Sequence, residues 1–228
     1  MRTPIKNSDR FFTELSEVEV IHNYNVDIRN REIFISGEDS TTEIGGAEPG
    51  VDHILSARII RNLRLLTNRS DKPILIHMKT CGGDWNEGMA IYDAIKLCPV
   101  YITILNYTHA RSMSSIILQA AGNRVMMPHS SFMFHHGTYG DEGEMKTVMA
   151  TMEWYKRSID IMCNLYVDSM KNTPHSKWNK SSRDKIRQWL DEQMDKKNDV
   201  FLSAADAVQH GFADSVFDGD WAALLAGG

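Results

Sequence analysis

The sequence predicts an α/β fold in which short buried strands alternate with amphipathic helices, followed by one helix of unusual length. Three observations lead to this prediction. Short apolar runs recur along residues 31–134, as in strands that a parallel sheet buries on both faces. Segments with apolar residues at helical spacing separate these runs, which is the pattern of crossover units. A single amphipathic segment then continues unbroken from Met145 to Met170.

The first half of the chain supplies the alternating elements. Residues 31–36 (REIFIS) have the composition of a strand, residues 38–50 are a loop rich in Gly and acid, and residues 54–66 show helical periodicity. The remaining elements are, in order, a strand at 73–78, a helix at 87–97, a strand at 100–105, a helix at 112–121, and short strands at 124–127 and 132–134.

The second half is mainly helical. Apolar residues in the long segment 145–170 step by three or four, and many are Met, a side chain that adapts to irregular partners. This pattern fits core packing and an association surface equally well. A polar loop at 172–182 and a charged helix at 183–197 follow. Ser203 begins a short last helix as a weak capping box with the acid three residues later.

The chain is predicted to hold one domain at 27–228 after an N-terminal arm at 1–26, flexible or removed by processing. Its 228 residues carry 25 Lys and Arg against 30 Asp and Glu, a formal net charge of −5, which argues against binding nucleic acid through phosphates. Neither a membrane span nor a signal peptide is evident. Cys81, Cys98 and Cys163 form no disulfide or metal pattern, so we expect a reducing, cytoplasmic compartment.

Several residues could carry chemistry. Ser112 stands at a strand-to-helix turn, where it is either a helix N-cap or a nucleophile. Ser114 and Ser115 are rival hydroxyls within the helix. The Gly82-Gly83 turn could present bare N–H groups to an anion.

A serine nucleophile needs a base near neutral pKa, and the sequence offers His135 and His136. Because adjacent strand residues point to opposite faces, only one of them can face Ser112. A metal site with His129 is disfavoured, because no carboxylate or thiolate lies at compact spacing; we predict neither a metal nor a cofactor in this subunit. Spacing alone cannot choose the carboxylate that would orient the base.

Four separated segments resemble the proteolytic subunit of the ATP-dependent Clp protease, the ClpP family of serine peptidases. They are a glycine turn and helix start (TCGG at 80–83, GMAIYD at 88–93), a nucleophile segment (ARSMS at 110–114, LQAAG at 118–122), a base segment (PHSSFMFH at 128–135) and an acid segment (DVFLSA at 199–204, AVQHGFADS at 207–215). The chain departs from the family pattern at Cys81, Arg111, Ser114 and Gly137, and residues 38–52 resemble an insertion.

The resemblance implies a ClpP/crotonase-like fold of repeated β-β-α units with a protruding handle helix at about 142–171. It implies a triad of Ser112, His135 and Asp199, and an oxyanion hole from the backbone N–H groups of Gly82 and Met113. It further implies heptameric rings stacked as a tetradecamer, a chamber that degrades polypeptides, and an AAA+ unfoldase that uses the ATP. A non-catalytic ring subunit and a crotonase-like acyl-CoA enzyme remain alternatives.

Overall fold

The computed structural model describes residues 17–36 and 50–225. Residues 1–16 of the predicted arm, residues 38–49 of the predicted insertion, Gly37 and residues 226–228 lie outside the described residues. Where the sequence pattern indicates only an arm, residues 17–24 are helical. The partly buried Val20 of this helix packs against the core.

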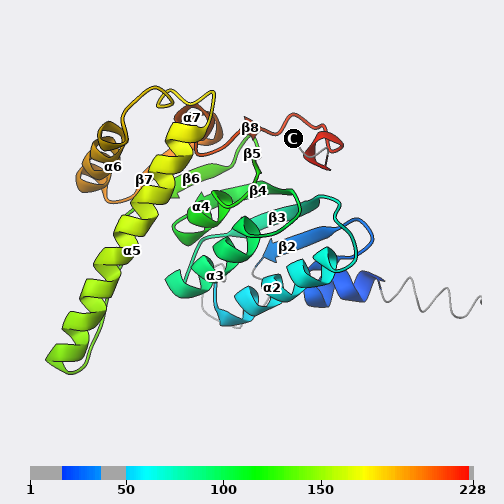
Figure 1. Cartoon of the computed structure of the whole chain (residues 1–228), viewed down its shortest axis with the longest axis horizontal. Coiled ribbons are helices and arrows are strands. Elements are labelled where there is room, and N and C mark those ends of the chain that lie inside the picture. Colours follow the sequence, from blue (N-terminus) through cyan, green and yellow to red (C-terminus); the bar gives the residue numbers. More distant parts are fainter. Residues whose placement is uncertain (1–16, 37–49, 226–228) are drawn as a thin grey trace, which may run out of the picture.

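An eight-stranded sheet runs through the described residues, and the fold is α/β, as predicted (Figure 1). Its strands are β1 (Val26–Asp27), β2 (Glu32–Ser36), β3 (Ile74–Thr80), β4 (Ile102–Arg111), β5 (Asn123–Met126), β6 (Ser131–Phe134), β7 (Val200–Ser203) and β8 (Ser215–Val216). The strands β2, β3, β4 and β5 pair in parallel, as crossover units require. Antiparallel pairs occur between β1 and β2 and between β6 and β7.

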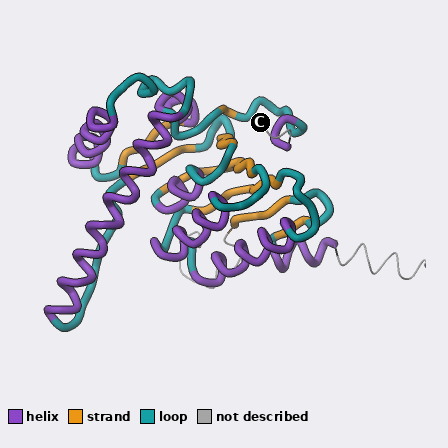
Figure 2. The backbone as a smooth tube through the Cα atoms, viewed as in Figure 1, coloured by secondary structure: helices purple, strands orange, loops and turns teal. Residues whose placement is uncertain are grey.

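Helices and a 3₁₀ turn complete the described chain. They are α2 (His53–Thr67), α3 (Trp85–Lys96), α4 (Met113–Leu118), α5 (Met145–Asn172), α6 (Arg183–Lys197), α7 (Ala204–His210) and a 3₁₀ turn at Ala223–Leu225. Figures 1 and 2 show α2 and α3 side by side along the sheet, and α5 extending away from it. The predicted capping box of Ser203 and Asp206 is present on α7, which ends at a left-handed Gly211.

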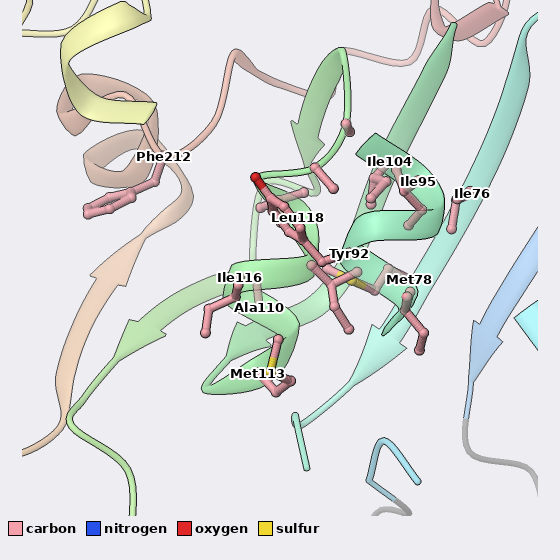
Figure 3. Close-up of a cluster of buried hydrophobic side chains, with 14 of the residues drawn as sticks. Ile76, Met78, Tyr92, Ile95, Ile104, Ala110, Met113, Ile116, Leu118 and Phe212 are labelled. Carbon is pink, nitrogen blue, oxygen red and sulfur yellow. The ribbon is translucent and has the colours of Figure 1, made fainter. Parts of the chain in front are cut away.

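The core lies between the sheet and its helices. Figure 3 shows part of it, where Ile76 of β3 and Ile104 of β4 face Ile95 of α3. All three side chains are buried. Because successive strand residues point to opposite faces, Leu75 of β3 points to the other face, as do Leu105 of β4 and Val125 of β5. There they form a smaller cluster with Leu224 from the chain's end.

Strand β4 is longer than predicted, and its length positions the candidate site. Thr103–Asn106 of this strand pair with β5, while His109–Arg111 pair with β6. Strand β6 pairs in turn with β7, which places Phe134 opposite Val200. Paired strands lie about 4.8 Å apart, so the residues at these three strand ends must be neighbours.

Helix α5 is half buried and half projecting. Its C-terminal half is anchored by buried residues such as Met162, Cys163 and Tyr166. Burial raises the pKa of the Cys163 thiol to about 11, which keeps it protonated and unreactive. The N-terminal half extends from the sheet (Figure 1) and exposes large apolar side chains, namely Met145, Met149, Met152 and Trp154.

His210 is a buried aromatic residue whose titration should make stability depend on pH. Its Nδ1 accepts the indole N–H of Trp178 at 3.0 Å, and its ring lies 4.5 Å from that of Trp189. Burial is the largest cause that lowers the pKa of His210, to about 4, and the positive charge of Lys177 is the second. A histidine with a depressed pKa stabilises the folded state fully above its unfolded pKa of about 6.5 and loses that contribution as the pH falls toward 4.

We therefore expect acidification from pH 7 to pH 4.5 to lower the Tm of the wild type. The Tm of the His210→Asn variant should fall by less over the same interval. The asparagine oxygen can still accept from Trp178 but does not titrate. Thermal unfolding followed by circular dichroism measures both values. The exposed His22→Asn variant is the control and should follow the wild type. Equal acid sensitivity in wild type and His210→Asn would contradict this assignment.

Candidate active site

Ser112 occupies a sharp turn between β4 and α4. Its backbone has φ 50° and ψ −125°, a conformation that costs a non-glycine residue about 1–3 kcal/mol. Although Ser112 is the N-cap of α4, its side chain makes no capping hydrogen bond. The Oγ instead lies 2.8 Å from Nε2 of His135. The hydroxyl is therefore turned toward a base rather than toward the helix.

His135 connects Ser112 to a carboxylate. It follows β6, and its Nδ1 lies 3.0 Å from Oδ1 of Asp199, the residue just before β7. A carboxylate accepts hydrogen bonds and so places the imidazole proton on Nδ1, which leaves Nε2 free to accept from Ser112. The His135 side chain is 19% exposed and that of Asp199 51%. The structure thus brings the three predicted triad residues into one hydrogen-bonded series.

His136 does not take part in this series. Its Nε2 faces Asp195 at 3.7 Å, on the other side of the strand end. Its backbone carbonyl accepts the hydroxyl proton of Tyr155 at 2.6 Å, which attaches the segment after β6 to α5. The two adjacent histidines therefore face different carboxylates.

The Gly82-Gly83 turn lies against the nucleophile turn. Gly82 has φ 102°, and a Cβ built there would lie 2.9 Å from both the Met113 nitrogen and the Ser112 Cβ. Gly83 has φ 150° and would meet Val51 at 2.4 Å. Both positions thus require glycine, for conformation and for space. The Gly82 N–H makes a long 3.4 Å contact with Thr80 Oγ1. The two predicted oxyanion donors, Gly82 and Met113, are neighbours in the structure.

A pocket of about 380 Å³ opens beside Ser112 and His135. Its apolar lining comes from α3, α4 and α5 and consists of Trp85, Met113, Ile116, Trp154, Ile159 and Met162. Figure 3 shows Met113 and Ile116 on α4. An apolar side chain bound here would hold the adjoining peptide group near Ser112. The sequence pattern did not indicate Trp154, because this residue lies outside the apolar stripe of its helix. A large aromatic side chain on the polar face of the helix could have suggested that it lines a binding pocket.

Two departures from the family pattern leave the nucleophile clear. Ser114 is fully buried, accepts the Arg111 N–H at 2.8 Å, and lies 2.8 Å from the Thr80 carbonyl. Its hydroxyl therefore joins the ends of β3 and β4. The Arg111 guanidinium lies over the Phe201 ring, 5.3 Å from its centre. Neither side chain comes between Ser112 and His135.

In residues 17–36 and 50–225, no three His, Cys, Asp or Glu side chains come together in a way that could hold a metal ion. In the same ranges, no helix combines the length and apolar character that crossing a membrane demands.

Comparison with known proteins shows where the chain belongs. The family model of Clp protease matches residues 46–220. A proteolytic subunit of the ATP-dependent Clp protease from Mesostigma viride is 29% identical over 203 residues, covering 86% of this chain and 77% of the relative. Proteolytic subunit 3 from Parasynechococcus marenigrum is 30% identical over 167 residues, or 72% and 76% of the two chains.

A relative from Pseudomonas aeruginosa and one solved structure extend this result. Proteolytic subunit 2 of the Clp protease from Pseudomonas aeruginosa is 24% identical over 83% of this chain and 82% of its own length. An asparagine-to-aspartate mutant of ClpP1 from Listeria monocytogenes superposes with a TM-score of 0.66 at 19% identity, covering 85% of this chain and 94% of that one. The chain therefore belongs to the Clp protease family.

Proposed function

We propose that this chain is a catalytic serine endopeptidase subunit. One observation carries the proposal: Ser112, His135 and Asp199 form a continuous hydrogen-bonded series with contacts of 2.8 and 3.0 Å. The nucleophile end of this series lies beside two backbone N–H groups. A nucleophile, a base with a defined tautomer and an oxyanion site are the parts that acyl transfer requires.

The residues have distinct roles in the proposed reaction. Ser112 Oγ attacks the carbonyl carbon of the scissile peptide while His135 Nε2 takes its proton. Asp199 stabilises the imidazolium that forms, and the N–H groups of Gly82 and Met113 donate to the developing oxyanion. His135 then protonates the leaving amine, which leaves an acyl-serine. Water, deprotonated by the same imidazole, releases the acid product and restores Ser112.

We also propose that the active sites lie inside a chamber. The projecting half of α5 carries exposed Met and Trp side chains, and apolar surface of this kind is typical of association surfaces. Two heptameric rings meeting through α5 would give a tetradecamer. An AAA+ unfoldase would use ATP and deliver unfolded polypeptides to it. The free thiols of the half-buried Cys98 and the buried Cys163 suit a reducing, cytoplasmic compartment.

Labelling with a fluorophosphonate tests this function and assembly together. The reagent traps an activated serine, so we expect one label per chain, at Ser112, and loss of peptide hydrolysis in proportion to labelling. Native mass spectrometry of the labelled sample counts both the chains and the labels. We expect fourteen chains with one label each, and hydrolysis of unfolded casein before labelling.

Other outcomes would contradict the proposal in specific ways. A ring without labels would indicate a non-catalytic ring subunit. A labelled monomer at micromolar concentration would retain the peptidase but reject α5 as a ring interface. Unlabelled protein that binds CoA thioesters would indicate an acyl-CoA enzyme instead.

A further inference from the structure

The backbone carbonyl of Ser112 is held by two hydrogen bonds from Ser115. The Ser115 N–H donates to it at 3.0 Å and the Ser115 hydroxyl at 2.5 Å. Ser115 is fully buried, so water cannot replace its hydroxyl as a donor. The strained turn at Ser112 is thus attached to the first turn of α4.

Tyr166 extends this attachment to α5. Its hydroxyl lies 2.7 Å from Ser115 Oγ. A carbonyl cannot donate, so the single hydroxyl proton of Ser115 points to Ser112, and Tyr166 must donate to Ser115. Tyr166 is fully buried, and burial raises the pKa of its phenol. The phenol therefore remains a donor across the working range of a peptidase. The order of donation is Tyr166 to Ser115 to the Ser112 carbonyl.

The held carbonyl belongs to the same peptide plane as the Met113 N–H. A peptide unit is rigid, and in the trans form its C=O and N–H point in opposite directions; the described chain has no cis peptide bond. Fixing the Ser112 carbonyl on the Ser115 side therefore aims the Met113 N–H the opposite way. That nitrogen lies beside Gly82, 2.9 Å from the position of a Cβ built there.

We propose that Ser115 and Tyr166 are positioning residues that orient the Met113 N–H toward the oxyanion by holding the other end of its peptide plane. This inference rests on the proposed peptidase function, because it assigns to the same site two residues that orient one of its oxyanion donors. It also makes α5 part of the catalytic geometry, because Tyr166 acts through its hydrogen bond to Ser115.

The hydrogen-bonded series from Tyr166 through Ser115 to the Ser112 carbonyl is called the relay below. Two single variants and their double variant test it by steady-state hydrolysis of a fluorogenic peptide. We expect Ser115→Ala and Tyr166→Phe to lower kcat by about 10-fold to 10²-fold with KM unchanged, less than the 10²–10³-fold effect of losing a whole oxyanion donor. The affinity for a peptide aldehyde, whose adduct carries an oxyanion, should fall in parallel. Because Tyr166 acts only through Ser115, the double variant should lose no more activity than Ser115→Ala.

Matched controls separate positioning from packing. Ser130 is buried, and its hydroxyl donates to the Met127 carbonyl three residues back at 2.8 Å, so Ser130→Ala removes the same kind of bond away from the site. Tyr92→Phe removes a buried phenol from α3. Both controls should keep kcat within about twofold. Additive losses in the double variant, or an unchanged kcat in Ser115→Ala, would overturn the relay.

Amide hydrogen exchange provides a measurement that does not depend on catalysis. We expect the amides of residues 112–118 to exchange several-fold faster in Ser115→Ala and Tyr166→Phe but not in Ser130→Ala. Unchanged exchange would overturn the relay even in an inactive protein. A wild-type protein that is inactive and takes no label would refute the proposed peptidase function but not the relay. Amide exchange would still test how Ser115 and Tyr166 hold the Ser112 turn.

Discussion

The Ser112→Ala variant should lose peptide hydrolysis by about 10⁶-fold in kcat, as serine peptidases do when the nucleophile is removed. The remaining rate, about 10³–10⁴-fold above that of water, would come from the oxyanion donors and substrate binding. Neither neighbouring hydroxyl can substitute for Ser112. Ser114 and Ser115 are fully buried, and each hydroxyl donates to a backbone carbonyl. Peptide hydrolysis and fluorophosphonate labelling measure the loss.

The fold of this variant should not change, because the Ser112 side chain makes no capping bond and alanine removes only the hydroxyl. The Tm of Ser112→Ala should stay within a few degrees of the wild type, which makes thermal unfolding the control. If a well-folded Ser112→Ala variant kept its peptidase activity, a different residue would have to be the nucleophile.

The second large effect is expected for Gly82→Ala. The added Cβ would lie 2.7 Å from the Arg111 carbonyl and 2.9 Å from the Met113 nitrogen, closer than carbon atoms approach in folded proteins. One of the two backbone segments must move, and either movement misaligns an oxyanion donor. Loss of one such donor costs about 10²–10³-fold in kcat, so we expect at least that reduction, measured with the same fluorogenic peptide.

Gly219→Ala is the matched control for this prediction. Gly219 has the same φ of 102° as Gly82, but a Cβ built there has no neighbour within 4 Å. Both variants therefore carry the strain of alanine at positive φ, and only Gly82→Ala adds a collision at the site. Equal activity of the two variants would contradict a role for the Gly82 turn in catalysis.

The sequence predicted the long elements well, because their periodicity is local. The helix at 145–170 corresponds to α5, and the apolar runs at 73–78 and 100–105 overlap β3 and β4. The strand β7 was not predicted. Its exposed Phe201 and its Ser203, a helix cap, give no alternating pattern. Only the partner strand β6 makes these residues a strand.

The candidate site shows the same division between local and long-range information. Ser112 and the Gly82 turn are visible locally, since each joins a strand to a helix. Residue chemistry alone left the carboxylate open, and the family resemblance singled out Asp199. In the structure, strand pairing sets Asp199 against His135 and leaves Asp195 to His136. The hydrogen bond from Tyr166 to Ser115 gave no sequence signal, because Tyr166 belongs to an ordinary apolar stripe.

The pairing of β4 with β6 and of β6 with β7 has a consequence for the order in which activity arises during folding. The two contacts of the triad join residues 23 and 64 positions apart, so this site has a high contact order. Chain closure over such separations carries an entropic cost and is slow. A partly folded chain that lacks either strand pair has no assembled triad. We therefore expect a newly made subunit to have no peptidase activity until these strand pairs have formed.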